Sequence, residues 1–231
     1  MVITLLAVMK KYSLRGTFKP EFCKQIYANG IGSIVTQSLY TIYIVGLNMI
    51  LKIFTEDAVT VLGIYYKIQS FFFIPLLGFQ QVLLPLFSYH YGAGDRHRNR
   101  NILKCAMTFS AAIMAVATGI FLLFPEKLVQ IFSMESTILA IGKYAFPVIS
   151  ISFVFAGLTI VITSYLQGIA HIKSSLFIIV LRQIVLLVPL AWAFHFMGLN
   201  AMWWTFPVTE IIASMTGILI IVILHKQDSA L

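Results

Sequence analysis

The sequence has little charge and almost no cysteine. Asp, Glu, Lys and Arg make up only 10% of its 231 residues, whereas hydrophobic residues make up 60%. An average soluble domain is about 25% charged, so this composition excludes an ordinary water-soluble fold. The two cysteines, Cys23 and Cys105, are far apart and form no CxxC pair, which excludes a disulfide scaffold and a zinc knuckle. The composition is that of a chain solvated by lipid.

Five long stretches carry no charged residue, and they are the strongest structural signal in the sequence. They are residues 25–51, 68–94, 105–125, 144–172 and 183–209. Because about 20 apolar residues in a helix cross a hydrocarbon core of about 30 Å, each stretch is long enough to span a membrane. None of them alternates in polarity as the strands of a transmembrane barrel do. We therefore predict an all-α membrane protein that forms a six-helix transmembrane bundle. The predicted spans are 26–51, 58–89, 102–124, 140–168, 174–196 and 201–224.

The predicted bundle occupies residues 26–225, with a short segment on either side. Residues 1–25 are predicted to be the end of a truncated transmembrane helix plus a basic cytoplasmic linker, and residues 226–231 a cytoplasmic tail. Residues 1–9 are apolar but too few to span, and Lys10 and Lys11 follow them, which is the reverse of the order in a signal peptide. A short apolar N-terminus can alternatively lie flat in the membrane interface.

Basic residues predict the orientation of the bundle. The net charge is +8, and the basic residues are concentrated in alternate loops: before the first span, at 96–104, at Lys173 and at Lys226. By the positive-inside rule, these loops and both termini are cytoplasmic. The same placement argues against nucleic acid as a partner, because the basic string at 94–100 lies between two spans.

Prolines and amides interrupt the apolar spans. Pro75 and Pro85 are helix-bend candidates, since each removes a backbone hydrogen bond and favours a kink. Such a bend is either purely structural or lines a cavity where water satisfies the freed carbonyls. Uncharged amides either join neighbouring helices or face a polar interior. The amide candidates for a substrate or ion pathway are Gln37, Gln69, Gln80 and Gln183.

Three charged residues, Lys67, Arg182 and Glu210, fall inside the predicted spans at similar depths. An intramembrane charge is costly and usually faces a partner or a water-filled cavity. We expect Glu210 to form an ion pair with Arg182 or Lys67, and an ion-binding role is the alternative. These three residues and Tyr40 complete the pathway candidates.

Catalytic motifs are absent from the sequence. It contains no HExxH, GxSxG, Walker A or dinucleotide-binding glycine pattern, and none of its five histidines lies a helical turn from an acid inside a span. We therefore predict that the protein is not an enzyme and has no catalytic residues, no metal site and no cofactor.

Motifs along about residues 20–225 resemble those of MATE (multidrug and toxic compound extrusion) transporters. Residues 73–81 (FIPLLGFQQ), Pro85 and residues 88–94 (SYHYGAG) are similar to the family's P-x-x-G-x-x-Q…P segment and its GYNYGA-like helix end. The same order of family elements continues with FP…IF at 124–132, QG at 167–168, LRQ…P at 181–189 and GL…W…P…E at 198–210. The resemblance is closest to the bacterial multidrug branch of the family.

The resemblance implies one lobe, the C-terminal half, of a twelve-helix antiporter in the bacterial cytoplasmic (inner) membrane. Such a protein exports amphipathic, often cationic drugs against an inward flow of H⁺ or Na⁺, with no cofactor beyond the coupling ion. The implied partners are drug molecules, membrane lipid and the missing N-terminal lobe or a second copy of this chain. Aromatic residues would suit flat cations through stacking and cation–π contacts. The candidates for such a lining are Tyr40, Tyr65, Phe71, Phe72 and Phe73.

The sequence also departs from the family pattern. His90 stands where the family usually has Asn, and Ser88 where it usually has Gly. No acid lies within 144–172, so we do not expect the sodium site of branches that place a carboxylate there. A lipid-linked oligosaccharide flippase of the same superfamily is an alternative, although it would favour a strongly cationic cavity. A membrane-embedded enzyme such as an acyltransferase and a purely structural bundle are less favoured alternatives.

Overall fold

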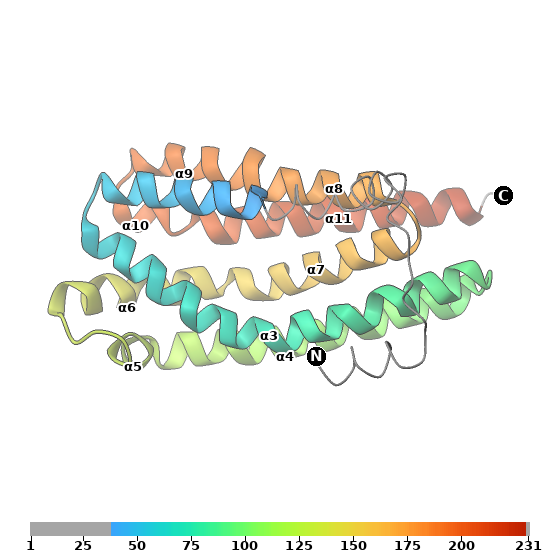
Figure 1. Cartoon of the computed structure of the whole chain (residues 1–231), viewed down its shortest axis with the longest axis horizontal. Coiled ribbons are helices and arrows are strands. Elements are labelled where there is room, and N and C mark those ends of the chain that lie inside the picture. Colours follow the sequence, from blue (N-terminus) through green and yellow to red (C-terminus); the bar gives the residue numbers. More distant parts are fainter. Residues whose placement is uncertain (1–37, 230–231) are drawn as a thin grey trace, which may run out of the picture. The chain divides into compact units, whose positions relative to one another are not determined.

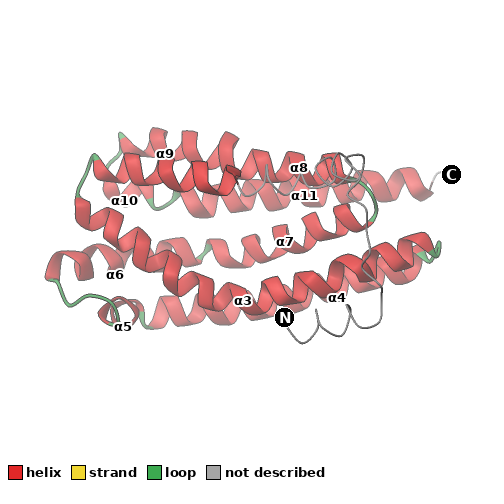
Figure 2. Cartoon of the chain, viewed as in Figure 1, coloured by secondary structure: helices red, strands yellow, loops and turns green. Residues whose placement is uncertain are grey.

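The structure is a computed structural model that describes the backbone of residues 38–229 and the side chains of residues 38–226. The predicted segment 1–25, the start of the first predicted span and Gln37 lie outside this range. Within it, every secondary-structure element is a helix, and short connections join them (Figure 2). This confirms the predicted all-α class for the part of the chain that the structure describes.

The helices follow one another along the chain with few intervening residues. In order they are a helix at Ser38–Lys52, α3 (Glu56–Gly92), α4 (Arg96–Leu123), α5 (Pro125–Gln130), α6 (Ser136–Ser150), α7 (Ser152–Gly168), α8 (Ile172–Val180), the π-helix η1 (Leu181–Leu187), α9 (Val188–His195), α10 (Leu199–Met202) and α11 (Thr205–Ser229). α11 continues past the predicted helix end at 224, so part of the predicted tail is helical.

Most of the predicted spans correspond to helices of sufficient length. Four helical segments, Glu56–Gly92, Arg96–Leu123, Ile172–His195 and Leu199–Lys226, are long and apolar enough to cross a membrane. The predicted span 140–168 corresponds to the pair α6 and α7, between which the helix axis bends by 43°. Only the second part of the first predicted span lies in the described residues, as the apolar helix Ser38–Lys52.

The basic string is helical from Arg96 onward, where the sequence predicted a loop before a span at 102. The Asp95 side chain accepts a hydrogen bond from the Arg98 backbone N–H (2.9 Å) and so caps α4, which begins at Arg96. A capping carboxylate satisfies one of the free N–H groups of the first turn, and this local preference extends the helix beyond its apolar part. Asn99 is consequently buried, and its amide donates to the Phe87 carbonyl (3.4 Å).

The break between α6 and α7 is accommodated by hydroxyl groups. Pro147 lies inside α6 and cannot donate a backbone hydrogen bond. The Ser150 hydroxyl donates to the Pro147 carbonyl (2.8 Å), the Ser152 hydroxyl to the Ile149 carbonyl (2.6 Å), and the Thr118 hydroxyl of α4 to the Ser150 carbonyl (3.0 Å). Side chains thus satisfy the carbonyls that a bent helix frees within an apolar environment.

α3 bends as its prolines predicted. It is continuous from Glu56 to Gly92 with Pro75 and Pro85 inside it, and Figure 1 shows it turning near its middle to run along α4. The Thr55 side chain accepts from the Ala58 N–H (3.1 Å) and caps its start.

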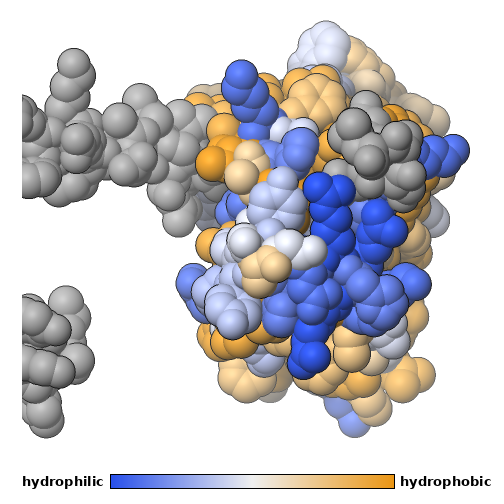
Figure 3. Space-filling model, turned by 90° about the vertical axis from the view of Figure 1, so that its right-hand side faces the viewer, coloured by the Kyte–Doolittle hydropathy of each residue, from blue (hydrophilic) through white to orange (hydrophobic). Residues whose placement is uncertain are grey.

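Successive helices connect at opposite ends of the bundle. The α3–α4 and α7–α8 connections and the end of α11 lie at one end, and the connections after Lys52, after α4 and after α9 lie at the other (Figure 1). Figure 3 looks onto the first end and shows hydrophilic residues gathered there. The exposed basic residues Arg98, Lys173 and Lys226 belong to the segments that meet at this end, as the alternate-loop pattern predicted.

α7 lies at the centre of the packing, against α3, α4 and α11. Its approach to α3 is close at Gly168, where a Cβ would lie 2.5 Å from the Cβ of Phe87 and 3.3 Å from the backbone nitrogen of Ser88. Small residues permit this kind of contact between membrane helices. The largest core cluster contains the fully buried rings of Tyr65 and Phe121 together with Phe153.

Candidate functional site

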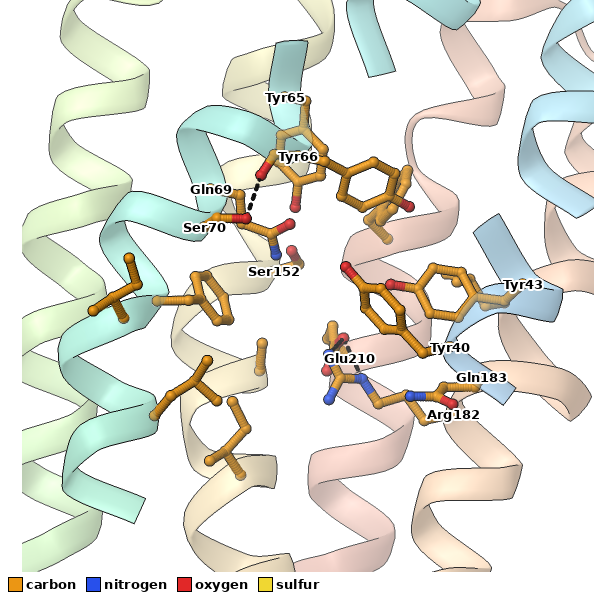
Figure 4. A pocket seen from close by; sticks show the side chains of 17 residues that line it. Tyr40, Tyr43, Tyr65, Tyr66, Gln69, Ser70, Ser152, Arg182, Gln183 and Glu210 are labelled. Atoms are coloured by element: carbon orange, nitrogen blue, oxygen red, sulfur yellow. Dashed lines mark hydrogen bonds and ion pairs between the residues drawn. The ribbon is translucent and has the colours of Figure 1, made fainter. Parts of the chain in front are cut away.

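A cavity of about 280 Å³ lies among five helical segments of the described bundle. Figure 4 shows side chains from α3, α7, α11, the helix Ser38–Lys52 and the π-helix η1 around a shared space. The lining combines aromatic rings, hydroxyls, amides and one opposite-charge pair. The residues with polar side chains that line it are Tyr40, Tyr43, Tyr65, Tyr66, Gln69, Ser70, Ser152, Arg182, Gln183 and Glu210.

Four tyrosines form the aromatic part of the wall. The Tyr40 and Tyr43 rings meet edge to face with centroids 5.2 Å apart, and the Tyr65 and Tyr66 rings lie 5.3 Å apart. Tyr40 and Tyr43 are three residues apart on one helix, so their side chains lie on the same face. On α3 the same helical face continues from Tyr66 to Ser70, whose hydroxyl donates to the Tyr66 carbonyl (2.7 Å).

A buried ion pair closes one side of the cavity. Both the Nε and the Nη2 of Arg182 lie 2.6 Å from Oε1 of Glu210. The Glu210 side chain is 9% exposed and that of Arg182 26% exposed, so the arginine is the partner more open to the cavity. No hydrogen-bond partner for Oε2 of Glu210 or Oε1 of Gln183 occurs among the residues that the structure describes.

Helix geometry brings the two charges together near the middle of the last two long helical segments. Glu210 is on α11, and Arg182 and Gln183 belong to η1, within the continuous segment Ile172–His195. The π-helical turn ends at Leu187, directly before the helix that contains Pro189. A proline ring clashes with the carbonyl four residues earlier, and the wider π turn relieves that clash. Single π-helical turns within helices are frequent at functional sites.

Five of the predicted pathway residues meet in this cavity, namely Tyr40, Gln69, Arg182, Gln183 and Glu210. The ion pair predicted for Glu210 is confirmed, with Arg182 as its partner. Gln37 lies outside the described residues, so its predicted role stays untested. Pro75 and Pro85 lie inside α3, and Ile74, next to Pro75, lines the cavity.

Two predicted pathway residues do not line the cavity. Lys67 is exposed, and its ammonium lies 5.7 Å from the ring centroid of Phe132, in the connection after α5. Lys67 was predicted to lie at a similar depth to Glu210, but its side chain does not face the cavity and its flexible stem carries the charge toward Phe132. Gln80 is half-buried on α3 and does not contribute to the lining.

Several residues that line the cavity were not predicted from the sequence, and two of the predicted phenylalanines lie elsewhere. Phe71 is largely exposed and Phe72 packs against Phe121 (5.7 Å between centroids), so of the three adjacent phenylalanines only Phe73 lines the cavity. Tyr43, Tyr66, Ser70, Ser152 and Phe206 were not predicted. Helical spacing could have indicated Tyr66 and Ser70, because residues 66, 69, 70, 73 and 77 share one face of a helix.

Comparison with known proteins identifies the family of this fold and site. The MatE family model matches residues 32–193, more than half of the chain. The chain belongs to the MATE family. Multidrug export protein MepA from Staphylococcus saprophyticus is 22% identical over 207 residues, which cover 90% of this chain and 46% of MepA. MepA from Staphylococcus aureus strain NCTC 8325 is 19% identical with the same coverage. This chain spans about half the length of these MATE relatives.

Solved structures show the same fold. An outward-facing multidrug resistance MATE transporter of the MOP superfamily superposes with a TM-score of 0.80 at 20% identity, over 88% of this chain and 46% of that one. The Vibrio cholerae MATE transporter VcmN in its bent form superposes with a TM-score of 0.82 at 18% identity, over 94% of this chain and 51% of that one. The described bundle is therefore similar to one half of a MATE transporter.

Proposed function

We propose that this chain is one lobe of a cation-coupled antiporter that exports amphipathic, cationic drugs across a bacterial cytoplasmic membrane. The observation that carries the proposal is the cavity inside a MATE-type bundle, where four tyrosine rings and a buried carboxylate line the same space. Transporter binding sites lie near the middle of the membrane, at the interface between structural repeats. Rings and a carboxylate are the groups that bind a flat organic cation.

The charge of the cavity supports drug export over the flippase alternative. A site for a pyrophosphate-linked lipid needs cations that no carboxylate neutralises. Arg182 is the sole basic residue among the described lining residues, and Glu210 compensates it. Lys67, the other cation predicted to be deep, lies outside the lining. The coupling ion is H⁺ or Na⁺, and the second lobe is a separate segment or another copy of this chain.

Export is tested in an efflux-deficient bacterium with ethidium accumulation as the readout. We would express residues 1–231 alone, and then together with the part of Staphylococcus saprophyticus MepA that this chain does not match. Gradient-dependent extrusion only in the co-expressing cells is the expected result, because the substrate pathway forms between two lobes. Extrusion by residues 1–231 alone would instead indicate that a second copy of the chain takes the place of the second lobe. Absence of extrusion in both strains would overturn the export proposal.

The orientation in the membrane is tested by cysteine labelling in a variant with Cys23→Ala and Cys105→Ala. The exposed residues Arg98 and Ser136 lie at opposite ends of the bundle. An impermeant maleimide should label Ser136→Cys in intact cells and Arg98→Cys only after permeabilisation, since basic loops stay cytoplasmic. Labelling of both variants in intact cells would contradict the predicted topology. Asn99, in the same basic string, is unsuitable because it is buried.

A further inference from the structure

Among the described residues that line the cavity, the only acid already has a cation bound to it. Among the described lining residues, Glu210 is the sole acid and Arg182 the sole base, and both contacting nitrogens of Arg182 converge on one carboxylate oxygen. We propose that Arg182 occupies the cation site of this cavity, so that an aromatic monocation binds Glu210 by displacing the guanidinium. This inference rests on the proposed function, because it concerns the same cavity.

The geometry of the pair suits displacement. A guanidinium usually binds a carboxylate as a fork, with one N–H group on each oxygen, and this arrangement is the stronger one. Here Oε1 receives both nitrogens, and Oε2 has no partner among the described residues. Glu210 can therefore turn from one cation to another without first losing bonds at both oxygens.

The cavity also offers the displaced arginine a second position. The Arg182 side chain is 26% exposed and lines the cavity, so it can move without leaving its polar surroundings. The Tyr40 hydroxyl and the side-chain amide of Gln69 face the same space (Figure 4). Each has an oxygen that can accept an N–H group. The tyrosine rings that then face the ligand favour a cation with an aromatic surface.

This exchange predicts an effect whose sign is unusual for the loss of a charged residue. If Arg182 only supports the fold, its removal should weaken ligand binding or leave it unchanged. If Arg182 competes for Glu210, its removal frees the carboxylate and should strengthen the binding of a cation. Removal of both charges should abolish that gain.

The test uses the full chain, purified in detergent, and benzyltrimethylammonium as the aromatic monocation. Its uncharged isostere, neopentylbenzene, is the ligand control. Arg182→Gln should lower the Kd of the cation by roughly tenfold or more, and Arg182→Gln with Glu210→Gln should return the Kd to the wild-type value or above. The isostere should bind all variants alike. Lys143→Gln, which breaks the exposed Lys143–Glu126 pair (2.5 Å, side chains 67% and 48% exposed), is the matched control and should not change the Kd.

A measurement on the unaltered chain covers the case in which Arg182→Gln does not fold. The sequence has five arginines, and Arg182 is the only one within a predicted span, so its Nε–H should be the arginine resonance most protected from solvent exchange. Saturation with benzyltrimethylammonium should shift that resonance and speed its exchange, because the Nε–H leaves the carboxylate.

Two results would overturn the inference: a Kd in Arg182→Gln that is equal to or higher than that of the wild type, or an unchanged Nε–H resonance at saturation. Either result leaves the export assay unaffected. Conversely, a chain that shows the exchange but supports no ethidium extrusion refutes the proposed function alone.

Discussion

Glu210→Gln is expected to lower the free energy of unfolding of the bundle by about 3–5 kcal/mol, the usual cost of removing one partner of a buried ion pair. The substitution preserves the size of the side chain but leaves the Arg182 guanidinium without its carboxylate in the interior of a membrane bundle. The Nε and Nη2 groups of that guanidinium both contact Oε1 of Glu210. Thermal unfolding in detergent, followed by tryptophan fluorescence, measures the loss.

The double variant Arg182→Gln with Glu210→Gln should be more stable than either single variant. Neutral side chains in place of a whole buried pair cost little, because the desolvation of both charges disappears together with their attraction. The double-mutant cycle therefore isolates the coupling of the pair. A double variant whose loss equals the sum of the two single losses would mean that the two charges do not interact. Lys143→Gln again serves as the exposed control and should change stability by less than about 1 kcal/mol.

The pairing of Glu210 shows how far the sequence could go at this site. Position along a helix gives depth in the membrane, and depth left Arg182 and Lys67 as equal candidates. The choice between them depends on which helix faces α11 and on the direction of each side chain around its helix axis. Arg182 is in η1, which contacts α11, whereas Lys67 reaches Phe132. The π-helical turn that helps to set the direction of Arg182 changes the residues-per-turn count on which a face prediction relies.

The spans were more predictable than the helix ends because lipid imposes a simple requirement on composition. The predicted spans 58–89 and 174–196 match α3 and the segment Ile172–His195 to within three residues at each end. Helix starts depend instead on single capping groups, and Asp95 extended α4 through a basic string that hydropathy assigned to a loop. The break at Ile151 was also missed, since Pro147 marks a bend but the hydroxyls of Ser150 and Ser152 determine how the chain resumes.

Phe121→Ala is expected to lower the free energy of unfolding by about 3–5 kcal/mol, the range for truncation of a buried phenylalanine. Phe121 is completely buried on α4. Its ring lies 4.9 Å from that of Phe153, 5.4 Å from that of Phe146 and 6.5 Å from that of Tyr65. In a membrane the loss comes from packing and from the void that remains, because lipid is as apolar as the side chain.

The same change should also weaken binding in the cavity, because Phe121 contacts Tyr65, which lines it, and Phe146 and Phe153, which lie on either side of the α6–α7 break. Leu123→Ala is the matched control on the same helix: Leu123 is 74% exposed, so its truncation should change neither stability nor the Kd of benzyltrimethylammonium. The free energy of unfolding of both variants is measured by urea denaturation in detergent. Equal losses for Phe121→Ala and Leu123→Ala would mean that the aromatic cluster does not hold α4 against the bent helix pair.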